Sequence, residues 1–330
     1  LIEPGERGGH PCAVNNRQAQ PQTLSADDHR RIGGDLDTGR SSGDDGRAVL
    51  WLAEGLYPVF AHGRSRRAHG MRNVVLGIIN GGSRALFFPT ALVMVATTTM
   101  RFDAGLLRMV PLHASVGGIL GIILLDMAGY AWHVASHQWP FLWRFHAVHH
   151  HDDTVDSTTA FRFHFCDVMI GSFVTLAVVG VLGLRVEHVL LYEMLLMPLS
   201  IFHHGNIRLP ERVDNVLRLL IVTPRMHWVH HSRWIAETNS NYSPLFSFWD
   251  RAFGTLRVRG DPDGIRFGLD GYTDADRATL RGCLATPFRP IKSRPGRDTR
   301  PGVDDTAPRA RSAERPAASP SPCEYSCAGP

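Results

Sequence analysis

The chain has 330 residues, 18 of them histidine, and a formal net charge of +4. Its 35 Lys and Arg residues are scattered among 31 acidic residues, and no motif of a nucleic-acid-binding fold accompanies them, so we expect no nucleic-acid partner. The five cysteines match neither a zinc knuckle nor a disulfide framework, which predicts free thiols at Cys12, Cys166, Cys283, Cys323 and Cys327.

Both ends of the chain are polar. Residues 1–47 are rich in Gly, Asp, Arg and Gln, and residues 273–330 become rich in Pro, Arg, Ser and Ala. Such segments bury too little apolar surface to offset the entropy of ordering, so we predict that the first is disordered and the second mostly so. The first methionine is Met71, which raises the hypothesis that the polar N-terminus is a non-native extension. The ordered domain is predicted at residues 48–272.

Four apolar runs in this domain predict a membrane protein, with buried helices of a soluble protein as the alternative. The first run, residues 74–99, contains Arg84, which must reach the interface or pair with an acid. The second, residues 109–132, is long enough to cross a hydrocarbon core of about 30 Å. Residues 168–184 and 189–202 form either two short spans or one re-entrant hairpin.

A basic segment precedes the first apolar run and predicts the orientation of the chain. By the positive-inside rule it faces the cytosol, and two crossings return the chain to that side at His133. A hairpin would return it there again at His204, so the histidine motifs would all face the cytosol. The basic residues are Arg64, Arg66, Arg67 and Arg72.

Histidines recur at helical spacing in an HxxxH motif and two HxxHH motifs. Residues three and four apart share a face of a helix, so each motif directs its imidazoles to one side. One metal ion takes about four to six ligands, so this set suits two ions better than one. With two further histidines, the ten candidate ligands are His133, His137, His146, His149, His150, His164, His204, His227, His230 and His231.

Helix-start signals precede both HxxHH motifs. Thr223 and Pro224 are typical of an N-cap and first helical position, and Pro140 similarly opens the helix of the first motif. Asp126 and Tyr130 share a helix face with the HxxxH pair. Asp126 is therefore a candidate either to orient an imidazole or to face water at the interface.

The other histidines fall outside these spacings. A single histidine without a spaced partner is more often a core or surface residue than a ligand. We interpret as non-ligands His10, His29, His62, His69, His113, His151, His188 and His203.

Further motifs accompany the histidines: Arg162-x-His164, His204-Gly-Asn206, Asn241-Tyr242, and Trp249-Asp250 followed by Phe253-Gly254-Thr255. With them, the chain resembles the fatty acid hydroxylase superfamily, which includes sterol desaturases, sphingolipid hydroxylases and alkylglycerol monooxygenases. It departs from that pattern at Phe165, Asp167 and Ser243, where the family often has Pro, Glu and Gly.

The resemblance implies an all-α integral membrane helical bundle with a histidine-rich di-metal cap on its cytosolic face. The ten histidines would hold two Fe ions, with zinc as a mis-metallation, and Asp126, Tyr130, Asn206 and Asn241 would lie beside the ligands. Candidate acceptors for the ring N–H groups are Asp126, Asp152, Asp153, Asp167 and Asn206.

This centre implies an oxidoreductase that uses O2 and external electrons to hydroxylate or desaturate a lipid C–H bond. No flavin, dinucleotide or haem motif is present, so we expect a ferredoxin or cytochrome b5-type donor. The abundance of Arg over Lys favours a bacterial protein of the cytoplasmic membrane. The alternative is a histidine-rich membrane metal-ion transporter or storage protein, which would carry its ligands at mid-span.

Overall fold

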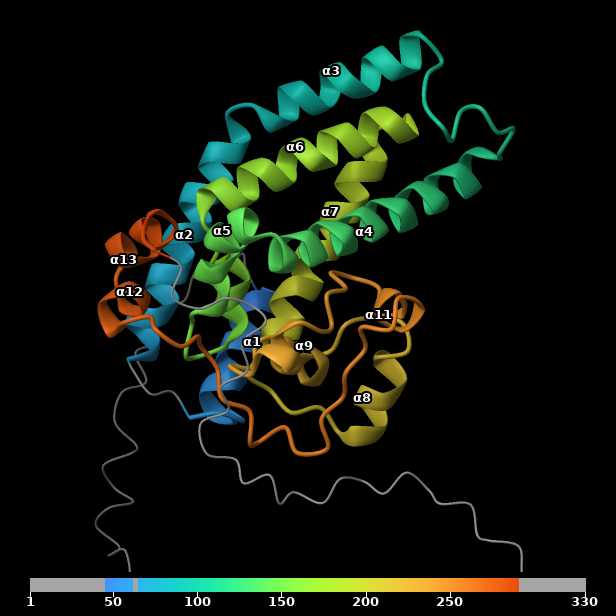
Figure 1. The fold of residues 1–330 in the computed structure, drawn as a ribbon. Coiled ribbons are helices and arrows are strands. Elements are labelled where there is room, and N and C mark those ends of the chain that lie inside the picture. Colours follow the sequence, from blue (N-terminus) through green and yellow to red (C-terminus); the bar gives the residue numbers. More distant parts are fainter. Residues whose placement is uncertain (1–44, 62–64, 291–330) are drawn as a thin grey trace, which may run out of the picture. The chain divides into compact units, whose positions relative to one another are not determined.

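The computed structural model describes residues 45–61 and 65–290, and it is helical there (Figure 1). In this part of the chain the strand-like contacts are two isolated bridges, Ile221 with Phe246 and Ser232 with Phe267. The all-α prediction is therefore confirmed. Predictions for residues 1–44, 62–64 and 291–330 lie outside the described residues.

The longer helices come first along the chain. They are α1 (Asp45–Leu56), α2 (Arg66–Ala85), α3 (Phe88–Arg101), α4 (Ala114–Gln138), α5 (Pro140–His150), α6 (Phe165–Leu182) and α7 (Val186–His204), with the 3₁₀ turn η2 (Ser157–Phe161) before α6. Shorter helices follow: α8 (Glu211–Leu217), α9 (Pro224–His230), α10 (Ile235–Thr238), α11 (Phe248–Ala252), α12 (Asp274–Ala278), α13 (Leu280–Ala285) and η3 (Thr286–Phe288).

Two helices, α4 and α6, are long and apolar enough to cross a membrane. The first predicted apolar run is not one straight helix, because α2 and α3 meet at a bend of 41°, and together they would make a third span. Helix α7, which contains the fourth apolar run, is not among the candidate spans. Figure 1 shows α3, α6 and α4 running alongside one another, and contacts join α3 to α6 and α4 to both α6 and α7.

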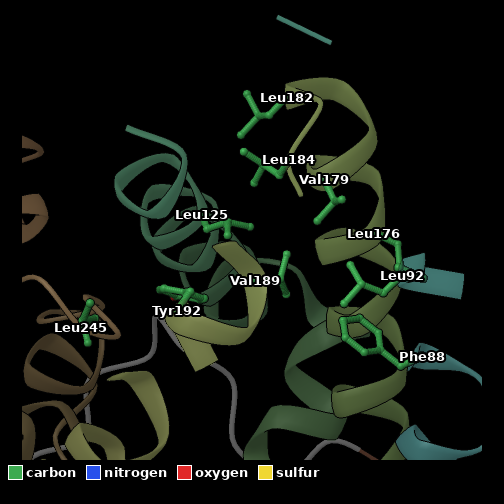
Figure 2. Packing of buried hydrophobic residues seen from close by; sticks show 10 residues of the cluster. All are labelled: Phe88, Leu92, Leu125, Leu176, Val179, Leu182, Leu184, Val189, Tyr192 and Leu245. Atoms are coloured by element: carbon green, nitrogen blue, oxygen red, sulfur yellow. The ribbon is translucent and has the colours of Figure 1, made fainter. Parts of the chain in front are cut away.

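Apolar side chains from these helices form the main hydrophobic core (Figure 2). Phe88 and Leu92 of α3 meet Leu176 of α6, and Val189 of α7 is completely buried. Residues of this kind recur at helical spacing, so each helix buries one side against its neighbours. Burial of the shared face holds these helices together.

The turn between α6 and α7 depends on Gly183. This residue ends α6 in the left-handed conformation, with φ 72°. A Cβ there would come within 2.6 Å of the Ala104 carbonyl oxygen, closer than real contacts allow. Glycine is the residue that adopts this conformation without strain, so it permits the tight reversal from α6 into α7.

Arg84 pairs with an acid. Its guanidinium forms two hydrogen bonds with the carboxylate of Glu193 on α7, one of them 3.1 Å long, and a further 3.1 Å bond with Ser172 on α6. The guanidinium also lies 3.7 Å from the ring centroid of Phe88. These contacts provide the partner that a charge among apolar helices requires.

The helical structure continues beyond the C-terminal domain boundary predicted at residue 272. Residues 273–290 form α12, α13 and η3, and Cys283 of α13 is completely buried against Leu76 of α2 and Val148 of α5. A capping box at Thr273 and Asp276 begins α12. Composition alone suggested a polar tail, but a few well-placed apolar residues are enough to dock these turns.

Asp126 is the middle residue of α4 and joins three parts of the fold. Its carboxyl oxygens accept hydrogen bonds from the Tyr192 hydroxyl of α7 at 3.1 Å, the Phe246 backbone N–H at 3.0 Å and the Trp249 indole N–H at 2.9 Å. The side chain is completely buried. It therefore fastens the segment around α11 to the middle of a candidate span.

We predict that Asp126→Asn destabilises the protein, because the new amide N–H₂ would face groups that are themselves donors. The free energy of unfolding should fall by about 1–3 kcal/mol, since buried donors are left unsatisfied. It can be measured by denaturant unfolding of the detergent-purified protein. Asp103→Asn is the matched control, because the Asp103 side chain is 85 % exposed and pairs with Arg108 at the surface. An equal effect of both substitutions would contradict the structural role.

Candidate metal centre

Nine of the ten predicted histidines gather in two groups whose ligand atoms all lie within 4.8 Å of one another. Nitrogens bound to one ion at about 2.0–2.1 Å lie at most about 4.2 Å apart, so small inward movements would complete ligation. Cluster A is His133, His137, His146, His150 and His230; cluster B is His149, His204, His227 and His231.

Helical periodicity divides the histidines of each HxxHH motif between the two clusters. On α5, His146 and His150 lie four residues apart and point to cluster A, while His149 points to cluster B. On α9 the pattern is reversed: His227 and the following His231 belong to cluster B, and His230 belongs to cluster A. Each motif thus serves both clusters, because adjacent residues on a helix diverge by about 100°.

Both helices begin at the predicted prolines, so the sequence placed the motifs in the correct turns. Pro140 opens α5 and Pro224 opens α9. Thr223 occupies the N-cap position of α9, although its side chain makes no capping hydrogen bond. The fixed φ of proline suits the first helical position, where its missing N–H costs no hydrogen bond.

Four cluster imidazoles are held through Nδ1 by oxygen acceptors that lie 2.7–2.9 Å away. The Nδ1 atoms of His133 and His230 lie 2.8 Å from the Tyr242 carbonyl oxygen and 2.7 Å from the Ser240 carbonyl oxygen. Those of His204 and His146 lie 2.7 Å from the Ser200 carbonyl oxygen and 2.9 Å from the Asp167 carboxylate. A carbonyl oxygen only accepts, so these rings carry their proton on Nδ1 and present a lone pair on Nε2.

Several Nε2 atoms of the clusters face one another at short range. Those of His133 and His146 are 3.1 Å apart, and the Nε2 of His204 lies 3.2 Å from that of His149 and 2.9 Å from that of His227. In the His133–His146 pair both atoms are lone-pair acceptors, so they cannot bond to each other. A shared cation would satisfy both, and the donor set therefore fits a metal ion.

Burial leaves other nitrogens of these rings without partners. They include Nε2 of His137 and His230, both nitrogens of His150, and Nδ1 of His149. Burial, with the neighbouring imidazoles, lowers the pKa of His149 and His150 on α5 well below its usual range. The same holds for the pKa of His227, His230 and His231. Neutral imidazole is the form that binds metals.

His164 lies outside both clusters, so the structure does not support its predicted ligand role. Its Nδ1 accepts a hydrogen bond from the Cys166 backbone N–H at 3.2 Å and caps the start of α6. Its ring stacks on Phe145, with centroids 5.5 Å apart. The isolated histidine in the sequence gave no spacing that would place it relative to the motifs.

The residues predicted to lie beside the ligands bind other parts of the chain, and none of their hydrogen bonds reaches a cluster imidazole. Asp126 makes the contacts described above, and the Tyr130 hydroxyl bonds to Thr255 at 2.9 Å. The Asn206 side chain binds the backbone of residues 59 and 60. The Asn241 amide donates to the carbonyl oxygens of residues 226 and 257.

Asp167, a predicted acceptor, does hold a cluster ring, through His146. Asn239, which was not predicted, lies 3.3 Å from Nδ1 of His137. His203 also lies close to cluster B without belonging to it: it is buried, and its ring centroid is 4.1 Å from that of His227. No repeated spacing marks Asn239 or His203 in the sequence.

A buried polar network supports the end of α5. His69, interpreted as incidental, lies 2.8 Å from Asp152 and 3.2 Å from Asp156 through its two ring nitrogens. Arg162 donates to the Val148 carbonyl oxygen at 3.1 Å and to Asn73 of α2 at 3.0 Å. Burial alone would raise the pKa of Asp152, but Arg162 and His69 outweigh it and lower that pKa. The network thus anchors the segment that carries His149 and His150.

Comparison with known proteins agrees with this geometry. The fatty acid hydroxylase family model matches residues 118–255, which include all nine clustered histidines. No solved structure matches the chain.

The chain is also similar to curated lipid-modifying proteins. The ornithine lipid hydroxylase OlsE of Rhizobium tropici is 29% identical over 179 residues, covering 54% of this chain and 51% of that protein. A cholesterol 25-hydroxylase-like protein of Danio rerio is 32% identical over 138 residues, covering 41% and 53%. The alkylglycerol monooxygenase of Danio rerio is 26% identical over 155 residues, covering 46% and 32%. The alignments thus span about half or less of these relatives.

The fold and the site define a helical protein with candidate membrane spans and two buried groups of neutral imidazoles. Residues 118–255 match the fatty acid hydroxylase family model, the family that the motifs suggested.

We predict that His204→Ala lowers the metal content by about one ion per chain, because three imidazoles would be left in cluster B. His164→Ala should retain the full content. Both can be measured by mass spectrometry of protein expressed with added iron, with His188→Ala as a control outside both clusters. Loss of metal in His164→Ala, or retention in His204→Ala, would contradict the assignment of the clusters.

Proposed function

We propose that this protein is a membrane-bound oxygenase that holds two iron ions in clusters A and B and oxidises a C–H bond of a lipid. The observation that supports this most is the convergence of buried, neutral imidazole nitrogens on two points. The reaction would consume O2 and external electrons and end in hydroxylation or desaturation.

Iron bound there would supply the activation of O2, because no protein side chain provides an oxidant that breaks an unactivated C–H bond. The task of the chain is to hold the ligand nitrogens in place. The Tyr242 and Ser240 carbonyl oxygens and the Asp167 carboxylate fix the orientation of three rings of cluster A. Such acceptors fix the tautomer and raise the basicity of the ligand.

Aromatic side chains close the centre to water. Phe163 stacks on His149 of cluster B, with ring centroids 4.2 Å apart, and Trp143 packs against His137 of cluster A at 5.1 Å. Burial raises the pKa of Tyr242 to about 12, so this phenol, which packs against the rings of His133 and His230, stays neutral at physiological pH. A dry, uncharged wall suits chemistry on an apolar carbon and limits side reactions with water.

The proposed substrate is a membrane lipid. The relatives are named for an ornithine lipid, cholesterol and alkylglycerol, which differ in their polar parts and share large apolar parts. The candidate spans α4 and α6 lead directly to the clusters: His133 and His137 lie on the last turns of α4, and Asp167 lies on the first turn of α6. A lipid chain between such helices would reach the ligands without leaving an apolar surrounding.

The electrons are proposed to come from a ferredoxin or cytochrome b5-type donor, with the clusters facing the cytosol of a bacterial cell. The cytosolic placement rests on the positive-inside rule applied to Arg66, Arg67 and Arg72 in the first turns of α2. The transporter alternative is less consistent with the site. Cluster rings are tethered by Nδ1 contacts and buried, whereas a transported ion needs ligands that release it.

We predict that His230→Ala and His231→Ala each abolish lipid oxidation, because each removes a ligand from a different cluster. The membrane lipids of a bacterial host expressing each variant can be compared by mass spectrometry for the loss of products that the unaltered chain forms. His188→Ala should retain the products. Full activity in either cluster variant would argue against a two-ion oxygenase.

We predict that Asp167→Asn lowers activity about 10–100-fold, because the amide holds His146 less firmly than the carboxylate does. Asp167→Glu should recover part of the activity. The matched control is Asp153→Asn, whose carboxylate lies 3.4 Å from Arg277 at the edge of the domain. If Asp167→Asn were as active as Asp153→Asn, Asp167 would have no part in the oxidation.

A further inference from the structure

We propose that α8, the Leu219–Leu220 turn that follows it and Phe253 after α11 form an in-plane contact with the lipid bilayer, in addition to the spanning helices. We call this surface the α8–α11 patch; it comprises Val213, Val216, Leu219, Leu220 and Phe253. Its proposed occupant is the headgroup and upper acyl region of a phospholipid monolayer.

The patch exposes more apolar surface than a water-facing helix normally does. The exposed fractions are 67% for Val216, 65% for Leu219, 58% for Leu220 and 56% for Phe253. Val213 and Val216 are three residues apart, so they share one side of α8. A contiguous exposed patch of large apolar side chains marks an interaction surface.

Hydrogen bonds place this patch beside a candidate span. The Leu220 carbonyl oxygen accepts from the Ser247 backbone N–H at 3.0 Å, and the Arg218 carbonyl oxygen accepts from the Ser247 hydroxyl at 2.7 Å. The neighbouring Phe246 N–H and Trp249 indole bind Asp126, the middle residue of α4. The patch is thus fastened to the midpoint of a helix that is long enough to cross the bilayer.

The length of α4 determines how close the attached patch lies to the bilayer. Helix α4 has 25 residues, which at 1.5 Å each give a length of about 37 Å. A hydrocarbon core of about 30 Å leaves only a few residues of α4 outside it. The midpoint of a spanning α4 therefore lies inside this core, so a segment attached there cannot stand clear of the bilayer. Its charged neighbours keep that segment at the level of the headgroups and upper acyl chains, where apolar side chains are also favoured.

Arginine side chains border the apolar patch. Arg212 is exposed on α8, and Arg251 donates to the Leu219 carbonyl oxygen at 3.3 Å from the α11 side. Asp214, on the same helix, is buried and pairs with Arg218 at 3.7 Å. Arginines at the edge of an apolar face are typical of helices that lie in the interface and reach for lipid phosphates.

The test is photocrosslinking of the full chain in nanodiscs of phosphatidylcholine and phosphatidylglycerol. Leu220→p-benzoylphenylalanine and Phe253→p-benzoylphenylalanine place the probe in the patch, and the second change conserves an aromatic ring. The control is Arg281→p-benzoylphenylalanine, at an exposed position on α13. We expect several-fold more phospholipid adduct at both patch positions than at the control, measured by mass spectrometry.

Adduct levels equal to those of the Arg281 control would overturn the proposal. So would crosslinking of the patch to a protein, either a second copy of this chain or an electron donor added to the nanodiscs, in place of lipid. Neither metal loading nor turnover is needed for the measurement. Its outcome is therefore independent of whether the protein is an oxygenase.

Discussion

The arrangement of lone pairs in the two clusters governs the rest of the structure. The Tyr242 carbonyl oxygen and the Asp167 carboxylate hold the ring protons of His133 and His146 on Nδ1, so their facing Nε2 atoms cannot donate to each other. Crowding neutral acceptors in a buried space is unfavourable without a cation, because they lose water and gain no hydrogen bond. The surrounding fold must therefore hold the rings firmly, and metal binding would add to the stability of the domain.

The supporting contacts come from segments far apart in the sequence. Glu54 of α1 accepts hydrogen bonds from the backbone N–H groups of Ser157 and Asn206, each at 2.8 Å, and so joins η2 to the end of α7 beside His204. Asp250 accepts from the Tyr242 backbone N–H at 2.7 Å, which positions the carbonyl oxygen that holds His133. These two buried carboxylates thus act on the clusters through the backbone, without contact to a ligand ring.

Much of the site could be predicted from sequence because helical spacing is local. The HxxxH and HxxHH motifs carry their own geometry, and the prolines at positions 140 and 224 mark where their helices begin. His164 and Asn239 depend on tertiary contacts, which spacing does not encode. The same reason explains Asp126: its helix face was predicted correctly, but its partners are residues 66 to 123 positions away. The bend between α2 and α3 and the docked turns after residue 272 likewise depend on packing.

The two clusters are mechanically coupled by the helices that they share. His149 and His150 are adjacent on α5, and His230 and His231 are adjacent where α9 ends, yet each pair divides between the clusters. A shift of either helix that improves ligation in one cluster therefore moves a ligand of the other. Two ions held in this way would be bound cooperatively, because the first to bind fixes α5 and α9 in the positions that the second requires. Division of each motif between two sites would therefore keep the two proposed ions at one defined separation, as joint chemistry on a single O2 molecule would require.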